Sequence, residues 1–556
     1  MSFLGWKLAF SLTKEEVRDA RPPGTVELLA HQPAKLGDAE EISDEVIHFP
    51  IPTADPSDPL NWPTWRKATV LAVAGLFAFV TNFTSSGIAP GLQAWPIAYP
   101  EDPARPFSEL THLIAVNVLM CGAANIWWVP LSNMYGRRPV LLVTTLLLTV
   151  CTAWCGVAKT YDSLLAARIF QGIGGAASDT VAPAMVGDVY FMHQRGRAMA
   201  MYTVSLVGGA LLGGVCGGYI TFNLGWAYNF WVGVGLSAPL FPAVLFLVPE
   251  TLYIRHDDVP ASDSQRPGSK EDAPGIETVE QIPAPAQKHK PFTWARSLGF
   301  RKSHPGLYHH FIQPWRSLMF PGTWVVMCHY AGLVGGTVTI STVGPQIVAQ
   351  PPYLWGNNSG LINVGALIGA LLGAAYTYFV SDFWLTQKAH SKSHHGLAEP
   401  EDRLPIMFPA LFVATAGFLV FGFCAQNPGP NVWVGIEAGY GMIAFGLMQA
   451  PSIGFSYVSI YRLPPMGFHA LLTIVSQLID AYSYMAGDCF VMVTILRSII
   501  AFAWTFFVAA WVEKKGVAEP FGIFGMLMGM FSLLTVPLWL FGKRSRIATA
   551  SKLVTE

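Results

Sequence analysis

"IWWVPLSNMYGRRPVLLVTTLLL", residues 126–148, holds two apolar runs separated by a short turn that carries one glycine and two arginines. Gly136 allows the chain to reverse between the runs, because glycine adopts backbone angles that other residues avoid. Arg137 and Arg138 are expected to hold this turn at an anionic membrane surface and to bond the free carbonyls that end the preceding helix. The alternative is that these arginines act only as a topology signal.

Composition points to a chain that is soluble in lipid. The protein has 556 residues, of which 52% are hydrophobic and 12% charged, and its mean hydropathy is +0.40. Apolar runs of about twenty residues recur, each long enough to cross a hydrocarbon core of roughly 30 Å as a helix. The net charge of -1 gives no indication of nucleic acid as a partner. The seven cysteines fall inside apolar runs without metal or disulfide spacing, so no metal or cofactor is expected.

The apolar runs predict an all-α membrane protein with twelve transmembrane helices in two pseudo-symmetric six-helix bundles. The runs lie at about 67–90, 110–131, 139–158, 163–188, 198–222, 227–248, 323–348, 359–380, 404–425, 432–457, 489–512 and 521–542. The predicted domain organisation is a cytosolic tail (1–65), a first bundle (66–248), a cytosolic linker (249–322), a second bundle (323–542) and a cytosolic tail (543–556). The linker contains a polar, proline-rich stretch that buries too little apolar area to order itself.

The two halves carry faint internal repeats. Asp188 and Tyr190 after the fourth run are echoed by Asp480 and Tyr482, which favours two related halves. Residues 458–477 have no counterpart in the first half, and their first and last residues can be encoded by typical intron signals. We interpret this segment as a retained intron; a genuine insertion or a re-entrant segment is the alternative.

The distribution of basic residues predicts the orientation. With a cytosolic N-terminus, Lys and Arg collect in the cytosolic loops, which agrees with the positive-inside rule. That side holds Arg66, Lys67, Arg137, Arg138, Arg195, Arg197, Lys388, Lys392, Arg403, Lys543, Arg544 and Arg546, against Arg105, Lys159, Lys514 and Lys515 on the other. Both termini are therefore expected in the cytosol, and the plasma membrane is favoured. Asn357, in an outer loop, has the pattern of a glycosylation acceptor.

Ionisable residues inside the runs are the candidate functional residues, because burying such a group mid-span costs roughly 2.5 to 3.5 kcal/mol. Asp179 is the first candidate for a proton-responsive or cation-binding carboxylate; a structural hydrogen bond is the alternative. Arg168 lies eleven residues earlier, which on a continuous helix returns to the same face within about 20°, so both are expected to face one cavity. Arg168 either binds an anionic group or has a structural role.

Three further polar residues are weaker candidates for substrate binding or ion coupling. Glu437 is a second carboxylate within a run, but it lies near the outer boundary, where solvation is equally expected. His329 titrates near neutral pH when unperturbed. Gln171 could hydrogen-bond a ligand or a neighbouring helix.

Two runs contain glycines at helical spacing. Residues 208–219 read "GGALLGGVCGGY" and residues 365–373 read "GALIGALLG". Glycines spaced by three or four residues let helices approach closely and bend at low cost. Both segments are expected to form close helix packing.

Several motifs resemble those of the major facilitator superfamily. "PLSNMYGRRPVLL" resembles its loop 2–3 signature G-x-L-[AS]-D-R-x-G-R-R-x-x-L, and it departs from it at Val129, Asn133 and Met134. Asn133 stands where the signature has aspartate, and in the family this aspartate helps to hold the two halves together. Asn133, Gly136, Arg137 and Arg138 are therefore the candidate gating residues. "ARIFQGIGGA" (167–176) resembles the signature of the fourth helix. The fifth helix resembles the antiporter motif G-x-x-x-G-P-x-x-G-G, with a glycine at position 214 where the motif has proline; its matched glycines are Gly209, Gly213, Gly217 and Gly218.

The resemblance implies a secondary transporter with a central cavity reached alternately from each side. The expected activity is proton-coupled efflux of a small organic molecule, a drug or a fungal secondary metabolite. Uptake of a cationic solute such as a polyamine, or a non-transporting sensor of the same fold, are the alternatives. An enzyme is not expected, because H-E-x-x-H and G-x-x-x-x-G-K-[ST] motifs are absent. The expected partners are the substrate, protons and the bilayer, with the chain as a monomer.

Overall fold

The computed structural model describes most of the helical runs. The described residues are 55–100, 105–253, 307–316, 321–389, 404–460 and 486–553, with short pieces at 10–11, 13, 17, 26–27, 29–31, 42–46, 318 and 397–398. Asp480 and Tyr482 lie outside them, and so do residues 461–477 of the segment interpreted as a retained intron. The repeat between Asp188 and Asp480 and the origin of that segment therefore stay predictions.

The first six predicted runs are helical. Several of these spans consist of two helices that meet at a short irregularity. The helices are α3 (Thr64–Ser86), α6 (His112–Ala123), α7 (Asn125–Tyr135), α8 (Arg137–Val157), α9 (Tyr161–Gly175), α10 (Ala177–Val189), α11 (Met192–Leu224), α12 (Trp226–Ser237) and α13 (Leu240–Leu247), with the short helices α4 (Trp95–Ala98) and α5 (Phe107–Leu110) between the first two spans.

The second six runs are helical as well. They form α16 (Pro321–Ala349), α17 (Asn363–Ala389) after the 3-10 turn η4 (Gly356–Ile362), α18 (Met407–Gln426), α19 (Trp433–Ile460), α21 (Ala486–Lys515), α22 (Ala518–Leu533) and α23 (Thr535–Leu553). Among the described residues, ten helical segments are long and apolar enough to cross a membrane. The other two predicted spans correspond to α9 with α10 and to α19.

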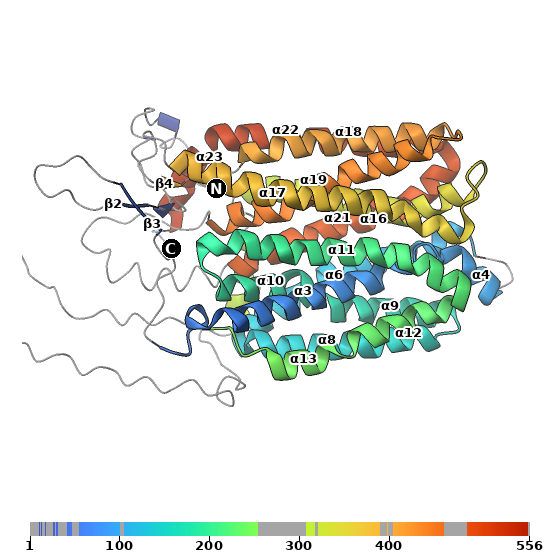
Figure 1. Cartoon of the computed structure of the whole chain (residues 1–556), viewed down its shortest axis with the longest axis horizontal. Coiled ribbons are helices and arrows are strands. Elements are labelled where there is room, and N and C mark those ends of the chain that lie inside the picture. Colours follow the sequence, from blue (N-terminus) through green and yellow to red (C-terminus); the bar gives the residue numbers. More distant parts are fainter. Residues whose placement is uncertain are drawn as a thin grey trace, which may run out of the picture.

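The helices run side by side along one axis, with the first half (α3 to α13) on one side and the second half (α16 to α23) on the other (Figure 1). The chain reverses between α7 and α8 at Gly136, and between α11 and α12 at Gly225. These turns lie at opposite ends of the bundle, which are named the Gly136 end and the Gly225 end below.

Few described residues lie outside the bundle. β1 (Val26–Glu27) pairs with β4 (Leu397–Ala398), and β2 (Leu29–His31) pairs with β3 (Ile42–Val46). The predicted linker also contains an ordered helix, α15 (Leu307–Arg316), which packs on α7 and α21.

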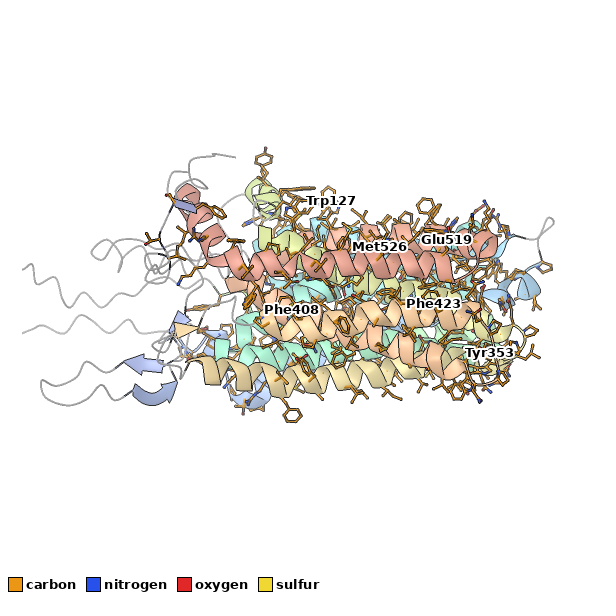
Figure 2. All side chains as sticks on the ribbon, turned by 90° about the horizontal axis from the view of Figure 1, so that it is seen from above. Trp127, Tyr353, Phe408, Phe423, Glu519 and Met526 are labelled. Carbon is orange, nitrogen blue, oxygen red and sulfur yellow. The ribbon has the colours of Figure 1, made fainter. Side chains whose placement is uncertain are left out.

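The outer surface of the bundle is apolar. Phe423 is 61% exposed and Met526 62% exposed, and Figure 2 shows both among the side chains that stand out along the bundle. Apolar surface of this extent needs a non-aqueous partner. It agrees with a bundle immersed in lipid, so the protein is a multi-pass membrane protein.

Glycines bring α11 against α3 at backbone distance. A Cβ atom at Gly209, Gly213 or Gly217 would lie within 3.0 Å of the carbonyl oxygen of Phe79, Phe83 or Gly87, respectively. Residues four apart on one helix therefore meet residues four apart on the other. The close packing predicted for this segment is confirmed.

The second glycine segment packs in the same way. A Cβ atom at Gly365, Gly369 or Gly373 of α17 would lie within 3.0 Å of a carbonyl oxygen of α19. The carbonyls belong to Glu437, Gly441 and Phe445. Both halves thus pack a row of glycines against a helix backbone, in the fifth span of the first half and in the second span of the second half.

Each half contributes side chains to the core of the other. Val491, Met492 and Ile495 of α21 belong to the apolar core of the first half. Val207 and Leu211 of α11 belong to that of the second half. The halves therefore meet along two interfaces, and polar groups between them are enclosed by apolar packing.

Candidate functional site

The fourth span is interrupted close to its candidate carboxylate. α9 ends at Gly175 and α10 begins at Ala177. The N–H of Ala176 bonds the carbonyl of Ile173, and the N–H of Asp179 bonds the carbonyl of Ala176, so both bonds span three residues instead of four. This tighter turn changes the helical phase between Arg168 and Asp179.

Asp179 forms an ion pair with Arg497 of α21. The Oδ2 atom of Asp179 accepts a hydrogen bond from the Nη2 group of Arg497. The two side chains are 9% and 7% exposed, respectively. Because Asp179 belongs to the first half and Arg497 to the second, the pair joins the halves inside the bundle.

A glycine allows α21 to come close enough for this pair. A Cβ atom at Gly122 of α6 would lie within 3.0 Å of the Ser498 side chain and of the Thr494 carbonyl. Only a residue without a side chain fits there, because the two backbones nearly touch. This contact lies next to Arg497 and fixes the position of α21 along its axis relative to the first half.

Two tyrosines complete the cluster. The hydroxyl of Tyr330 on α16 accepts a hydrogen bond from Nη1 of Arg497 at 3.1 Å, and the centre of its ring lies 4.9 Å from the guanidinium carbon. The Tyr202 hydroxyl on α11 donates to the carbonyl of Ser178, next to Asp179. Four helices, α10, α11, α16 and α21, therefore meet at one buried charge pair.

Arg168 lies in a different environment. Its guanidinium donates to the carbonyls of Leu113 (3.2 Å), Thr84 (3.1 Å) and Ser85 (2.8 Å), and to Oε1 of Gln171 (2.7 Å). Gln171 in turn donates to Thr152 at 2.9 Å. This arginine joins helices of the first half through their backbones.

The shared cavity of Arg168 and Asp179 stays a prediction, but the helical phase on which it rests does not hold. The eleven-residue phase presumes a continuous helix, and the interruption at Ala176 removes that premise. Arg168 is saturated by carbonyls, whereas Asp179 is bound to Arg497. Gln171 belongs to the structural network of Arg168.

The side chain of Glu437, on α19, contacts the N-terminus of α17. Its Oε2 atom accepts a hydrogen bond from the backbone N–H of Gly365 at 2.6 Å, in the first turn of α17. The free N–H groups and the dipole of a helix N-terminus both favour a carboxylate there. In this structure Glu437 binds α17 to α19.

His329 contacts the residues on either side of the break between α22 and α23, which together form the last span. Its Nε2 atom lies 2.7 Å from the carbonyl oxygen of Phe531 and 3.1 Å from the Thr535 hydroxyl. These residues flank the break between α22 and α23 at Leu534. His329 thus contacts the last span, whereas the next residue, Tyr330, contacts Arg497.

The turn between α7 and α8 holds a second buried charge cluster. Nη1 of Arg137 donates to Oδ1 of Asn133 at 2.6 Å and to the Ser132 hydroxyl at 3.0 Å, and its Nε lies 3.4 Å from Oδ2 of Asp188. Arg137 is only 2% exposed. The expectation that Arg137 faces the membrane surface is therefore wrong: its charge is paired inside the protein.

Arg138 and Gly136 meet Glu250, the residue that follows α13. Glu250 accepts hydrogen bonds from the backbone N–H groups of Arg137 (2.8 Å), Arg138 (3.2 Å) and Leu252 (2.9 Å). Burial raises the pKa of Glu250 above its ordinary value, and these three hydrogen bonds act in the opposite direction. The Arg138 side chain donates to the carbonyl of Leu245 at 2.8 Å, so the carbonyl that it bonds belongs to α13 and not, as expected, to the preceding helix.

Gly136 is required for two reasons, which can be separated by mutation. Its φ is +111°, and a Cβ atom there would lie within 3.0 Å of the Glu250 carboxylate. Gly225 has nearly the same φ, +110°, but open space around it. We expect Gly225→Ala to cost about 1–3 kcal/mol of backbone strain. Gly136→Ala should cost about 2 kcal/mol more, because it also displaces Glu250 from its backbone donors.

Thermal inactivation of the two purified variants in detergent measures this difference. Equal midpoints for Gly136→Ala and Gly225→Ala would show that the contact with Glu250 contributes nothing.

Sequence comparison identifies the family. The profile of the Major Facilitator Superfamily matches residues 68–479. The chain belongs to the Major Facilitator Superfamily. It is 25% identical over 558 residues to an uncharacterized MFS-type transporter of Schizosaccharomyces pombe, covering 92% of this chain and 90% of the relative. It is 22% identical over 503 residues to the citrinin biosynthesis cluster MFS transporter mrr1 of Monascus ruber, covering 88% and 89%.

Solved structures agree in fold. The xylose transporter XylE of Escherichia coli, in a partially occluded inward-open conformation, superposes with a TM-score of 0.53 at 14% identity, covering 86% of this chain and 98% of XylE. The chain is an MFS transporter, and its all-α, twelve-helix fold is the MFS fold.

The MFS loop signature is altered in sequence, and the substituted residue is hydrogen-bonded within the loop. Asn133 takes the place of the family's aspartate and accepts a hydrogen bond from Arg137. The negative charge comes from Asp188 on α10 instead. The charge that Asn133 lacks is therefore supplied from another helix.

Gly214, which replaces the proline of the MFS antiporter motif, faces the other half. A Cβ atom there would lie within 3.0 Å of the Asn363 side chain of α17, and one at Gly218 would lie 3.3 Å from the carbonyl oxygen of Asn357. The Tyr219 hydroxyl donates to Oδ1 of Asn358 at 2.8 Å. The fifth helix thus meets the second half at the Gly225 end. The Asn357 side chain is exposed beside this contact, and its glycosylation stays a prediction.

Sequence reasoning missed Arg497 and the role of Asp188. A signal for Arg497 was present, since it is an arginine in the middle of the apolar run 489–512, and such a residue needs a partner. Within the described residues, no group of three His, Cys, Asp or Glu side chains could hold a metal ion.

Proposed function

We propose that this MFS transporter exports a small organic molecule in exchange for protons, and that Asp179 is the group that carries the proton. The observation that carries the proposal is the buried ion pair between Asp179 and Arg497, which joins the two halves. A carboxylate in that position must change its partner whenever the halves move apart.

Protonation of Asp179 breaks the pair by removing its negative charge. In a low-dielectric interior, two unpaired charges are far less stable than a charge pair. When the site is empty and deprotonated, the halves are therefore held together through Asp179 and Arg497. A proton on Asp179, or a ligand that takes the place of Arg497, releases them.

This behaviour suits exchange better than cotransport. An exchanger must reorient when it carries a proton or a substrate and must stay fixed when it carries neither, since otherwise the gradient is dissipated. An ion pair that forms only in the empty, deprotonated state has this effect, and proton and substrate then compete for one carboxylate.

The relatives favour efflux of a metabolite. The Monascus ruber relative is described as a transporter of the citrinin biosynthesis cluster. Secretion of the product of a biosynthetic cluster is an outward flux, which an inward proton gradient can drive.

We also propose the domain organisation and the orientation given by the sequence. Both tails and the linker are cytosolic, the Gly136 end faces the cytosol, and the chain works as a monomer in the plasma membrane. Arg66, Lys543 and Arg544 lie on the cytosolic side in this orientation. The positive-inside rule supports it.

Proton movement in proteoliposomes tests the function. Purified protein is reconstituted into vesicles that contain a fluorescent pH indicator, and a panel of neutral, cationic and anionic organic solutes is added under an imposed pH gradient. Exchange predicts that a transported solute moves protons in the direction opposite to its own movement. Protons and solute moving in the same direction would instead indicate uptake. Failure of every solute to move protons, with binding retained, would favour a sensor.

A further inference from the structure

The guanidinium of Arg497 uses only part of its hydrogen-bonding capacity. Nη2 donates to Asp179 and Nη1 donates to Tyr330 at 3.1 Å. Nε is buried and has no hydrogen-bond partner. Arg497 as a whole is 6% exposed, so no bulk water reaches this donor.

The unused donor lies on a specific edge of the group. Nε–H and one N–H of Nη2 point in parallel, and together they form the fork that holds two acceptors side by side. Asp179 engages this fork with a single oxygen, Oδ2. One prong of the fork is therefore open beside the ion pair.

Tyr330 keeps the fork in place. Its hydroxyl binds Nη1, on the opposite side from the open prong, and its ring packs against the guanidinium with 4.9 Å between the ring centre and the central carbon. When Asp179 is withdrawn, these contacts remain. The fork then still points toward the place that the carboxylate occupied.

Charge limits what can enter this site. Asp179 and Arg497 together have no net charge, and they are enclosed between apolar cores. Apart from the proton of the proposed exchange, a cation would leave a net positive charge inside the bundle and an anion a net negative one, and both are costly at low dielectric. A ligand without net charge leaves the balance unchanged.

We propose that the transported molecule is electrically neutral and presents a hydrogen-bond acceptor next to a donor, as a carboxamide or a hydroxy-ketone does, and that this group inserts between Asp179 and Arg497. Its acceptor takes the fork of Arg497 and its donor binds the Asp179 carboxylate. The inference rests on the proposed function, since it assigns the substrate class of the same site.

Two consequences follow from the insertion. A proton on Asp179 removes the acceptor that the ligand's donor requires, so proton and ligand exclude each other. In addition, the ligand-bound form carries no net charge at the site while the protonated form carries one positive charge. Each exchange therefore moves one charge across the membrane.

Three probes of one shape test the substrate class: benzamide, benzoate and benzylamine. Current across a supported membrane that holds the reconstituted full-length protein is recorded under an outward substrate gradient and an inward proton gradient. We expect a current with benzamide and weaker responses with the two ions. Exchange of benzylamine for a proton moves no net charge, so proton uptake without current would assign a cationic substrate and overturn this inference.

Arg497→Lys tests the fork, because lysine keeps the charge and loses the parallel donors. We expect the apparent affinity for benzamide to fall about tenfold in Arg497→Lys and to be lost in Arg497→Gln. Arg105→Lys, which alters a partly exposed pair with Glu109, is the matched control and should leave the affinity unchanged. Size-exclusion profiles establish that each variant is folded.

The outcomes separate the two proposals. Unchanged benzamide affinity in Arg497→Lys, preference for benzoate or benzylamine, or no response to benzamide would overturn the substrate class. If proton exchange with another solute still requires Asp179 in that case, the proposed function stands. Absence of proton exchange with every solute would remove the proposed function itself.

Discussion

Asp179→Asn is expected to abolish proton-driven transport while the protein continues to fold. Asparagine has the shape of aspartate, but it cannot take up and release a proton. The proposed site therefore can no longer couple the pH gradient to transport. The expected result is a loss of pH-driven solute flux of at least about a hundredfold, on the order of 3 kcal/mol in coupling. Flux into proteoliposomes with and without a pH gradient measures it.

The same substitution leaves Arg497 as an unpaired buried charge. Removing one partner of a buried pair costs about 3–5 kcal/mol, so the midpoint of thermal inactivation should fall. Arg497→Gln should lower it less, because Asp179 can neutralise itself by binding a proton. The double variant Asp179→Asn/Arg497→Gln removes both charges and should recover much of the stability without recovering the coupling.

This double-mutant cycle separates the structural role of the pair from its role in transport. A single variant Asp179→Asn that retains pH-driven flux would contradict the assignment of the proton to Asp179. A double variant that loses as much stability as the two single variants together would show that the pair contributes no mutual stabilisation.

The fold could be predicted from sequence because its determinants are local. An apolar run of about twenty residues specifies a spanning helix whatever its neighbours are, and the twelve predicted runs coincide with the helices. The glycines of α11 and α17 could also be predicted, since a spacing of four residues places them on one face of a helix. Each of these patterns is complete within about thirty residues.

The site could be predicted only in part, because its pairing is not local. Asp179 and Arg497 are 318 positions apart, and no spacing rule links them. Arg168 was assigned to the same cavity by helical phase, which the tight turn at Ala176 alters. The burial of Arg137 depends on Asp188, which comes from another helix. Sequence identified Asp179 and Arg168 as buried charges and missed Arg497, and the packing of the helices decided the partners of all three.

Gly217→Ala is expected to have the largest effect on stability of any single methyl group added to α11. Its Cβ would lie within 3.0 Å of the carbonyl oxygen of Gly87, where α3 ends. That oxygen also accepts a hydrogen bond from Nδ2 of Asn229 at 2.8 Å, and the same Nδ2 bonds the Thr221 hydroxyl at 2.9 Å. The methyl group therefore cannot be accommodated without separating three helices, α3, α11 and α12.

Gly208→Ala is the matched control on the same helix. No atom lies within 4 Å of a Cβ at Gly208, so the added methyl meets no neighbour, and alanine favours a helix over glycine by about 1 kcal/mol. We expect Gly208→Ala to be neutral or slightly stabilising. Gly217→Ala should lose about 2–4 kcal/mol through overpacking and the broken hydrogen bonds of Asn229. Thermal inactivation midpoints in detergent measure both. If the two midpoints fell by the same amount, direct backbone packing of α11 on α3 could not be the reason for the glycines, because this explanation requires the same substitution to cost far more at Gly217 than at Gly208.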